Sequence, residues 1–118
     1  MIRAMQTSFD IYTTQFSPFQ FRQMRILEFP AYATFAQSFA NTVPYSDGLG
    51  FTTRIDDARN ARETDRIDFV TYVTAHELAH QWWAHQIIGG DMQGSTMLSE
   101  TFAQYSALLV MEHLYGKD

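Results

Sequence analysis

The residues best suited to chemistry stand in one short run, His76-Glu77-Leu78-Ala79-His80, which is an HExxH motif. On a helix, residues four apart lie on one face about one turn apart, so the two imidazoles can converge on a single ion. The glutamate beside the first histidine can then reach a water molecule on that ion. The chain has no cysteine, so a metal here must use imidazole and carboxylate ligands. The motif therefore predicts a zinc site with His76 and His80 as ligands and Glu77 as general base.

A hydrolytic zinc site needs a third protein ligand and keeps its fourth position for water. The metzincin pattern is excluded, because Trp83 and Gln86 stand where that class has glycine and histidine. Glu100 is the preferred third ligand, since a helix-turn-helix can fold it back onto the ion. Asp91 and Glu112 are the competing carboxylates, the former on a glycine-rich loop and the latter three turns farther along the last helix.

The two remaining histidines are expected to have structural roles. At about 100° per residue, His85 falls on the opposite face of the helix from His76, which favours a hydrogen-bonded packing role. His113 lies far around the last helix from Glu100 and is expected to be structural or exposed.

The HExxH motif is expected on a buried helix that spans residues 64–87. Thr64 or Asp65 can cap its first turn, and the charged stretch over residues 54–68 predicts a solvated loop leading into it. The helix is apolar on almost every side, which predicts that it is buried and that the two tryptophans after the motif belong to the core.

Glu100 is expected on a last helix over residues 95–116. Ser95 or Thr96 can cap that helix, and Gly116 should end it. A loop with two adjacent glycines separates it from the HExxH helix.

Residues 1–63 are expected to hold a helix followed by short strands. The stretch 24–29 alternates and is closed by a proline, which predicts a strand, and the β-branched and aromatic content of residues 49–55 predicts another. The stretch 31–44 has no clear period and is expected to be irregular. The first helix has apolar residues spaced three and four apart, which predicts one inward face. That face consists of Ile2, Met5, Phe9, Tyr12 and Phe16.

Composition limits the remaining possibilities. With 118 residues, 46% of them hydrophobic, the chain has room for a single domain with one core. The formal net charge is −5 and no basic run is present, so neither nucleic acid nor an anionic membrane is an expected partner. No segment is expected to insert into a membrane. The elements together predict an α+β fold that is mainly helical.

The stretch His76 to Trp82 (HELAHQW), followed by Glu100-Thr101-Phe102-Ala103 before Tyr105, resembles the aminopeptidase N family of gluzincin zinc metallopeptidases. It is most similar to the peptidase-like domain of bacterial proteins that also carry an ABC-transporter permease region. The resemblance implies a thermolysin-like catalytic domain that hydrolyses peptides. It also implies one Zn²⁺ per chain, held by His76, His80 and Glu100, with Glu77 as general base.

The sequence departs from that family at three points. Nineteen residues, 81–99, separate the second histidine from Glu100, one more than is usual in the family. The region 42–50 lacks the glutamate of the family's GxMEN motif, which holds a substrate amine, so Asp47 is the only substitute there and the choice between exopeptidase and endopeptidase action stays open. Ser95 stands where the family has an acidic residue that supports a zinc-binding histidine.

The family's oxyanion-stabilising tyrosine has no counterpart in this sequence. Residues 1–118 are therefore expected to be a single partial domain, the zinc-binding core of a longer polypeptide. Whether the parent protein is associated with a membrane, and in which compartment this domain lies, stays open.

Three hypotheses follow from these observations. The preferred one is a zinc metallopeptidase acting on peptide substrates. The second is a regulatory or peptide-binding module that keeps the zinc without catalysis, suggested by the missing amine anchor. The third is a packing domain in which the HExxH motif arose by chance.

Overall fold

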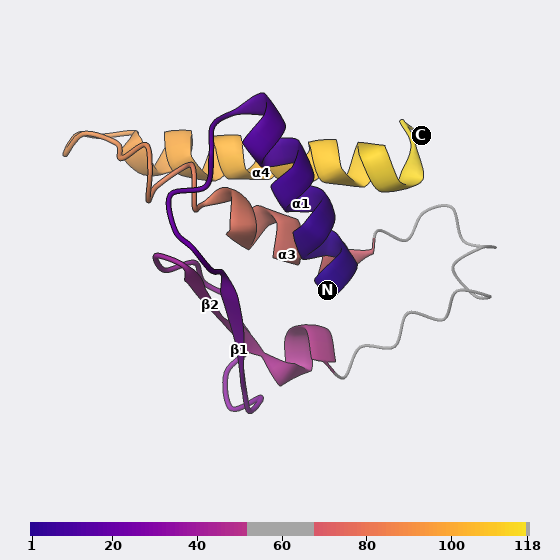
Figure 1. Ribbon diagram of the computed structural model, residues 1–118. Helices are drawn as coiled ribbons and strands as arrows, with labels where there is room; N and C mark the ends of the chain where they lie inside the picture. The colour runs from indigo at the N-terminus through magenta and orange to yellow at the C-terminus, as the bar shows by residue number, and fades with distance from the viewer. Residues whose placement is uncertain (52–67, 118) are drawn as a thin grey trace.

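In the part of the chain that the structure describes, three α-helices and a pair of strands form the fold, and one of the helices carries the HExxH motif (Figure 1). The computed structural model describes residues 1–51 and 68–117. The helices are α1 (Ile2–Gln15), α3 (Phe69–Ala79) and α4 (Ser95–Tyr115), and the strands are β1 (Arg25–Phe29) and β2 (Thr42–Ser46). The arrangement is α+β with more helix than strand, as the sequence predicts.

The core forms where α1 crosses α3 and α4. The Tyr12 hydroxyl is buried and donates a hydrogen bond to the Ala75 carbonyl at 3.0 Å, which fixes α1 on α3. Trp82 packs edge-on against Tyr12, with ring centroids 5.4 Å apart. Alanines at the contact between α3 and α4 leave room for close approach. The buried core residues are Tyr12, Ala75, Leu78, Ala79, Trp82, Ala103, Ala107 and Val110.

The first helix is confirmed, but its inward face is shifted from the predicted one. The buried residues of α1 are Ala4, Ser8 and Tyr12, spaced four apart, and Phe9 and Phe16 pack against the core at the flank of this row. Ile2 is 75% exposed. It lies two residues, or about 200° of helix, before Ala4, so it belongs to the opposite side.

The two strands pair in parallel, with Arg25 opposite Thr42 and Phe29 opposite Ser46. β1 confirms the strand predicted at 24–29. The prediction of irregular structure over 31–44 holds for residues 31–41, which form turns and isolated bridges, and is wrong for residues 42–44, which belong to β2. Pro44 stands in the middle of β2 and hides the strand signal, because proline is rare in paired strands.

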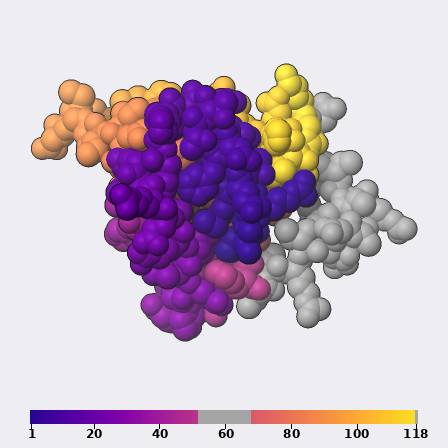
Figure 2. Space-filling view, viewed as in Figure 1, coloured from indigo at the N-terminus to yellow at the C-terminus, as the bar shows by residue number. Residues whose placement is uncertain are grey.

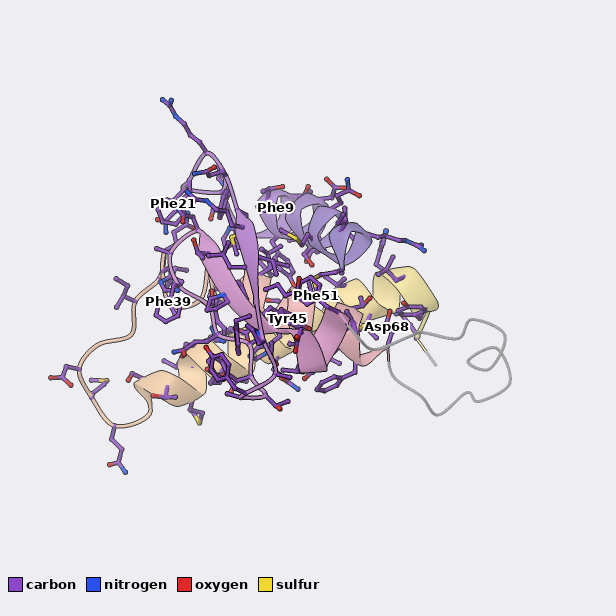
Figure 3. All side chains as sticks on the ribbon, turned by 90° about the horizontal axis from the view of Figure 1, so that it is seen from below. Phe9, Phe21, Phe39, Tyr45, Phe51 and Asp68 are labelled. Atoms are coloured by element: carbon purple, nitrogen blue, oxygen red, sulfur yellow. The ribbon has the colours of Figure 1, made fainter. Side chains whose placement is uncertain are left out.

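The strand predicted at 49–55 is wrong for the residues that the structure describes there, and residues 52–55 lie outside them. Residues Asp47–Phe51 instead form a π-helical turn, η1. Tyr45 and Phe51 lie side by side where β2 runs into this turn, with ring centroids 6.0 Å apart (Figure 3). A Cβ at Gly50 would lie 2.8 Å from the Tyr45 ring, so only glycine lets the backbone at residue 50 pack this closely against Tyr45.

The HExxH helix is shorter than predicted. Asp68 caps α3 by accepting from the Thr71 backbone amide at 3.0 Å and from the Thr71 hydroxyl at 2.6 Å. The predicted caps Thr64 and Asp65, and nearly all of the charged stretch, lie outside the described residues. The predicted end at residue 86 or 87 is wrong, because α3 ends at Ala79.

The chain turns sharply after α3. The amide of Ile87 donates to the Trp82 carbonyl at 2.8 Å, which closes a compact turn rather than a further stretch of helix. Ala84 has a φ of 137°, a value that no helix contains. The segment that follows, orange in Figure 2, projects from the body of the molecule toward the start of α4.

α4 begins at Ser95 with Gly94 as its N-cap and no side-chain cap, so the predicted capping by Ser95 or Thr96 is wrong. Its end at Gly116 is as predicted; this glycine has a φ of 93°. The Tyr115 hydroxyl donates to the Asp68 carboxylate at 2.6 Å, which ties the end of α4 to the start of α3. Within the residues described, no helix is long and apolar enough to cross a bilayer.

Candidate metal centre

Three side chains predicted as metal ligands converge between α3 and α4. The Nε2 atoms of His76 and His80 lie 3.2 Å apart. Glu100, in the second turn of α4, places Oε2 3.2 Å from His76 Nε2 and Oε1 3.4 Å from His80 Nε2. Among the described residues, no other group of three or more histidine, aspartate or glutamate side chains is placed to hold a metal ion.

The separation of the two imidazole nitrogens suits a zinc ion. A tetrahedral ion with bonds of roughly 2.0–2.1 Å holds its ligand atoms about 3.3 Å apart. The 3.2 Å between the two imidazole nitrogens agrees with that value, and Glu100 presents a different oxygen to each of them. With one ligand atom taken from each residue, the three atoms lie within 4.8 Å of one another. Two imidazoles and a carboxylate are also a usual ligand set for zinc that leaves a fourth position open. The residues present therefore fit the ion that the motif implies.

The two histidines are suited to a metal for different reasons. His80 donates from Nδ1 to the Trp83 carbonyl at 3.0 Å, which leaves the lone pair on Nε2 directed at the centre. Burial and the neighbouring His80 lower the pKa of His76, and these effects outweigh the opposing influence of Glu100 and Gln104. His76 is therefore favoured as a neutral imidazole, the protonation state of a ligand.

Glu77 lies beside the cluster without belonging to it. Burial raises the pKa of its carboxyl, and the charge of Glu100 acts in the same direction. The nearby His80 and a hydrogen bond from the Ser38 backbone amide lower the pKa in opposition. Glu77 lines the same cleft as His76, His80 and Glu100.

The cluster opens into a cleft of about 380 Å³ with two walls. One wall comes from α3, α4 and the turn after α3, and the other comes from the segment before β2. The lining residues are Ala36, Gln37, Ser38, His76, Glu77, His80, Ala84, His85, Ser99 and Glu100.

The second wall behaves as an extra strand at the edge of the sheet. Ala36 pairs antiparallel with Tyr45, flanked by bonds from the Gln37 amide to the Pro44 carbonyl at 3.2 Å and from the Ser46 amide to the Phe35 carbonyl at 3.0 Å. Main-chain groups alternate in direction along an extended segment. Since Gln37 is directed at β2, the N–H and C=O of Ala36 are directed away from it, toward the cleft.

His85 is the clearest difference from the sequence prediction. The helical angle that placed it opposite His76 does not apply, because α3 ends at Ala79. The turn returns His85 to the cleft, where its Nε2 lies 3.3 Å from the Ser38 carbonyl oxygen. It does make a hydrogen bond, as predicted, but at the cleft.

The competing candidates lie elsewhere. Asp91 is exposed in the loop before α4, Glu112 pairs with Lys117 at 3.4 Å, and His113 is exposed as expected. Asp47 lies in η1 and does not line the cleft, so its substrate role stays a prediction.

Trp83 contributes more than the core packing predicted for it. Its Nε1 donates to the Ser106 hydroxyl at 2.9 Å, and its ring stacks on Phe102 with centroids 4.8 Å apart. These contacts with α4 fix the carbonyl that orients His80. The only sequence signal is its position three residues after a ligand, which is too common to be informative.

Comparison with models of known protein families gives no match, and comparison with curated proteins gives no significant match. The function of this chain is therefore inferred from the geometry of the cluster and its cleft.

Proposed function

We propose that this chain is the zinc-binding part of a metallopeptidase of the aminopeptidase N type, a gluzincin. The observation that carries the proposal is the convergence of His76, His80 and Glu100, with ligand atoms within 4.8 Å of one another, beside Glu77 and open to a cleft. The thermolysin-like character suggested by the sequence resemblance belongs to the same proposal.

The residues present divide the chemistry between them. Zinc held by the two imidazoles and Glu100 would polarise a scissile carbonyl and lower the pKa of a water molecule to about 7. Glu77 accepts the proton of the attacking water and returns it to the leaving amine. His80 keeps its orientation through the Trp83 carbonyl while this happens.

The edge segment supports a peptide as the substrate. The main-chain groups of Ala36 face the cleft rather than β2, and Ala36 lines the same space as the cluster. An extended peptide can add to such an edge by main-chain hydrogen bonds, whatever its side chains. A substrate bound in this way would run its backbone past the ligand atoms.

Replacing Glu77 tests the proposal. We expect Glu77→Gln to abolish hydrolysis of a peptide or amino-acid amide while zinc content stays at about one ion per chain, because Gln cannot accept the proton. Glu112→Gln is the matched control, since that carboxylate pairs with Lys117 on the surface. Full activity in Glu77→Gln would refute the mechanism.

A second candidate is a module that binds zinc and peptide without hydrolysis. It is favoured by the lining residues, none of which is a tyrosine, arginine or lysine placed to stabilise an oxyanion among the part of the chain described. Such a donor contributes about 3–4 kcal/mol to acyl transfer. Zinc-dependent peptide binding without turnover, in this chain and in any longer parent, would favour this candidate.

A further inference from the structure

Gln81 follows the second histidine of the motif and is almost fully buried, with 1% of its surface exposed. Its Nε2 donates to the Ser38 hydroxyl at 2.6 Å and to the Phe39 carbonyl at 2.8 Å. Its Oε1 accepts from the Asn41 backbone amide at 2.8 Å. All of these partners belong to residues 38–41, the segment between the cleft and β2, so the side chain joins the two walls of the cleft.

Ser38 is held on three sides by residues from the end of α3. Its hydroxyl accepts from Gln81, and its carbonyl accepts from His85 Nε2 at 3.3 Å. By the same alternation that directs Ala36 toward the cleft, the main chain of Ser38 is directed away from β2. Its amide donates to the Glu77 carboxylate.

We propose that Gln81 is a positioning residue, whose buried amide fixes Ser38 so that the Ser38 main chain meets Glu77 and the free edge at Ala36 lies beside the ligand cluster. The inference rests on the proposed function of Glu77 as general base. Only a side chain with both donor and acceptor groups can satisfy Phe39 and Asn41 together, because a carbonyl needs a donor and an amide needs an acceptor.

Two substitutions separate the donor and acceptor roles. Gln81→Met keeps the length of the side chain and removes both roles. Gln81→Glu keeps the acceptor for the Asn41 amide and removes the donation to Ser38 and Phe39. If Gln81 served only to stabilise the fold, its substitution would speed amide exchange throughout the protein, in proportion to the loss of free energy of unfolding.

Amide hydrogen exchange, followed by NMR in the zinc-free and zinc-loaded chain, decides between these roles. In Gln81→Met we expect the Ser38 and Asn41 amides to exchange at least tenfold faster. In Gln81→Glu the Asn41 amide should stay protected while the Ser38 amide loses protection. The Tyr72 amide, bonded to the Asp68 carbonyl at 2.9 Å within α3, is the internal reference and should not change.

Ser106→Ala is the matched control. It removes the partner of Trp83 Nε1 on the other side of the same turn and leaves the contacts of Ser38 in place. Its Ser38 amide should exchange as in the wild type. Wild-type protection of Ser38 in Gln81→Met, or an equal loss of protection at Ser38 and Tyr72, would overturn the inference.

Kinetics provide the second readout. We expect Gln81→Met to lower kcat about ten- to a hundredfold at unchanged zinc content, because a displaced catalytic group loses its alignment. If Glu77→Gln is inactive but Gln81→Met keeps the wild-type kcat, the inference fails and the proposed function stands. If Glu77→Gln stays active, the proposed function fails, and the exchange measurement still decides whether Gln81 positions Ser38.

Discussion

The two walls of the cleft are built by different means. The ligand wall uses histidines one helical turn apart and a glutamate on the next helix. The opposite wall is fixed by hydrogen bonds between residues 40 to 47 positions apart, from Gln81 and His85 to Ser38 and Asn41. The residues of the first wall follow a local helical spacing, whereas the surface that faces them depends on contacts between residues far apart in the sequence.

The largest expected effect tests the ligand wall directly. We expect His80→Ala to lower the affinity for zinc by more than a hundredfold, because loss of a ligand should exceed the roughly 10–100-fold cost of losing an outer hydrogen bond. Competition with a chromophoric chelator measures the change. His113→Ala, at an exposed position on α4, is the control and should bind zinc as the wild type does.

A zinc affinity of His80→Ala within a few fold of the wild type would contradict the assignment of His80 as a metal ligand. In that case the helical spacing would not mark a metal centre, and the convergence of its three side chains would have to be explained by packing alone.

The sequence predicts the convergence of His76, His80 and Glu100, which the structure shows. The four-residue spacing of His76 and His80 needs only one turn of helix, and α3 supplies it before ending at Ala79. Glu100 is reached by folding the next helix back, for which a loop of almost any path suffices. These predictions are robust because they depend on the period of a helix rather than on where the helix begins or ends.

The opposite wall could not be predicted from local patterns. β2 contains Pro44, which obscures the strand, and its neighbour Ala36 pairs with it through only an isolated bridge. The prediction for His85 is wrong because it assumes that the helix continues through Ala84, whereas α3 ends at Ala79. No local sequence pattern predicts the positive φ of Ala84, because the surrounding turn imposes it.

Asp68 tests how the helices of the ligand wall are held together. Burial raises the pKa of its carboxyl. The Thr71 and Tyr115 hydroxyls, the Thr71 amide and the N-terminal charge act in the opposite direction, and together they leave the pKa below its usual value. We expect Asp68→Ala to lower the free energy of unfolding by about 2 kcal/mol at pH 7, through loss of the cap and of the link to α4. Urea unfolding followed by circular dichroism measures this.

The effect should depend on pH in one direction. A carboxyl whose pKa is lower in the folded state contributes stability above its unfolded value of 3.8, and that stability is lost as the pH falls through the folded pKa. The difference between wild type and Asp68→Ala should therefore shrink below about pH 4. Asp91→Ala, on the exposed loop, should change stability by less than about 0.5 kcal/mol. A difference that is the same at pH 7 and pH 3 would contradict the role of the charge.

The smallest effect concerns the turn where the two walls join. Ala84 lies between Trp83, whose carbonyl orients His80, and His85, which contacts Ser38. Its φ of 137° costs about 1–3 kcal/mol for a residue with a Cβ. Glycine avoids this cost, and the greater entropy that it gives the unfolded chain lowers stability by only about 0.4–1 kcal/mol. We expect Ala84→Gly to raise the free energy of unfolding by about 1 kcal/mol.

Ala40→Gly is the matched control, because Ala40 is exposed beside the opposite wall and does not have a positive φ. It should lower the free energy of unfolding by about 0.4–1 kcal/mol, through the entropy of the unfolded chain alone. If Ala84→Gly raises the free energy of unfolding and Ala40→Gly lowers it, the walls on either side of the turn hold Ala84 in its positive φ. If both variants lose stability equally, Ala84 has an ordinary backbone, and the path that brings His85 to Ser38 must be different.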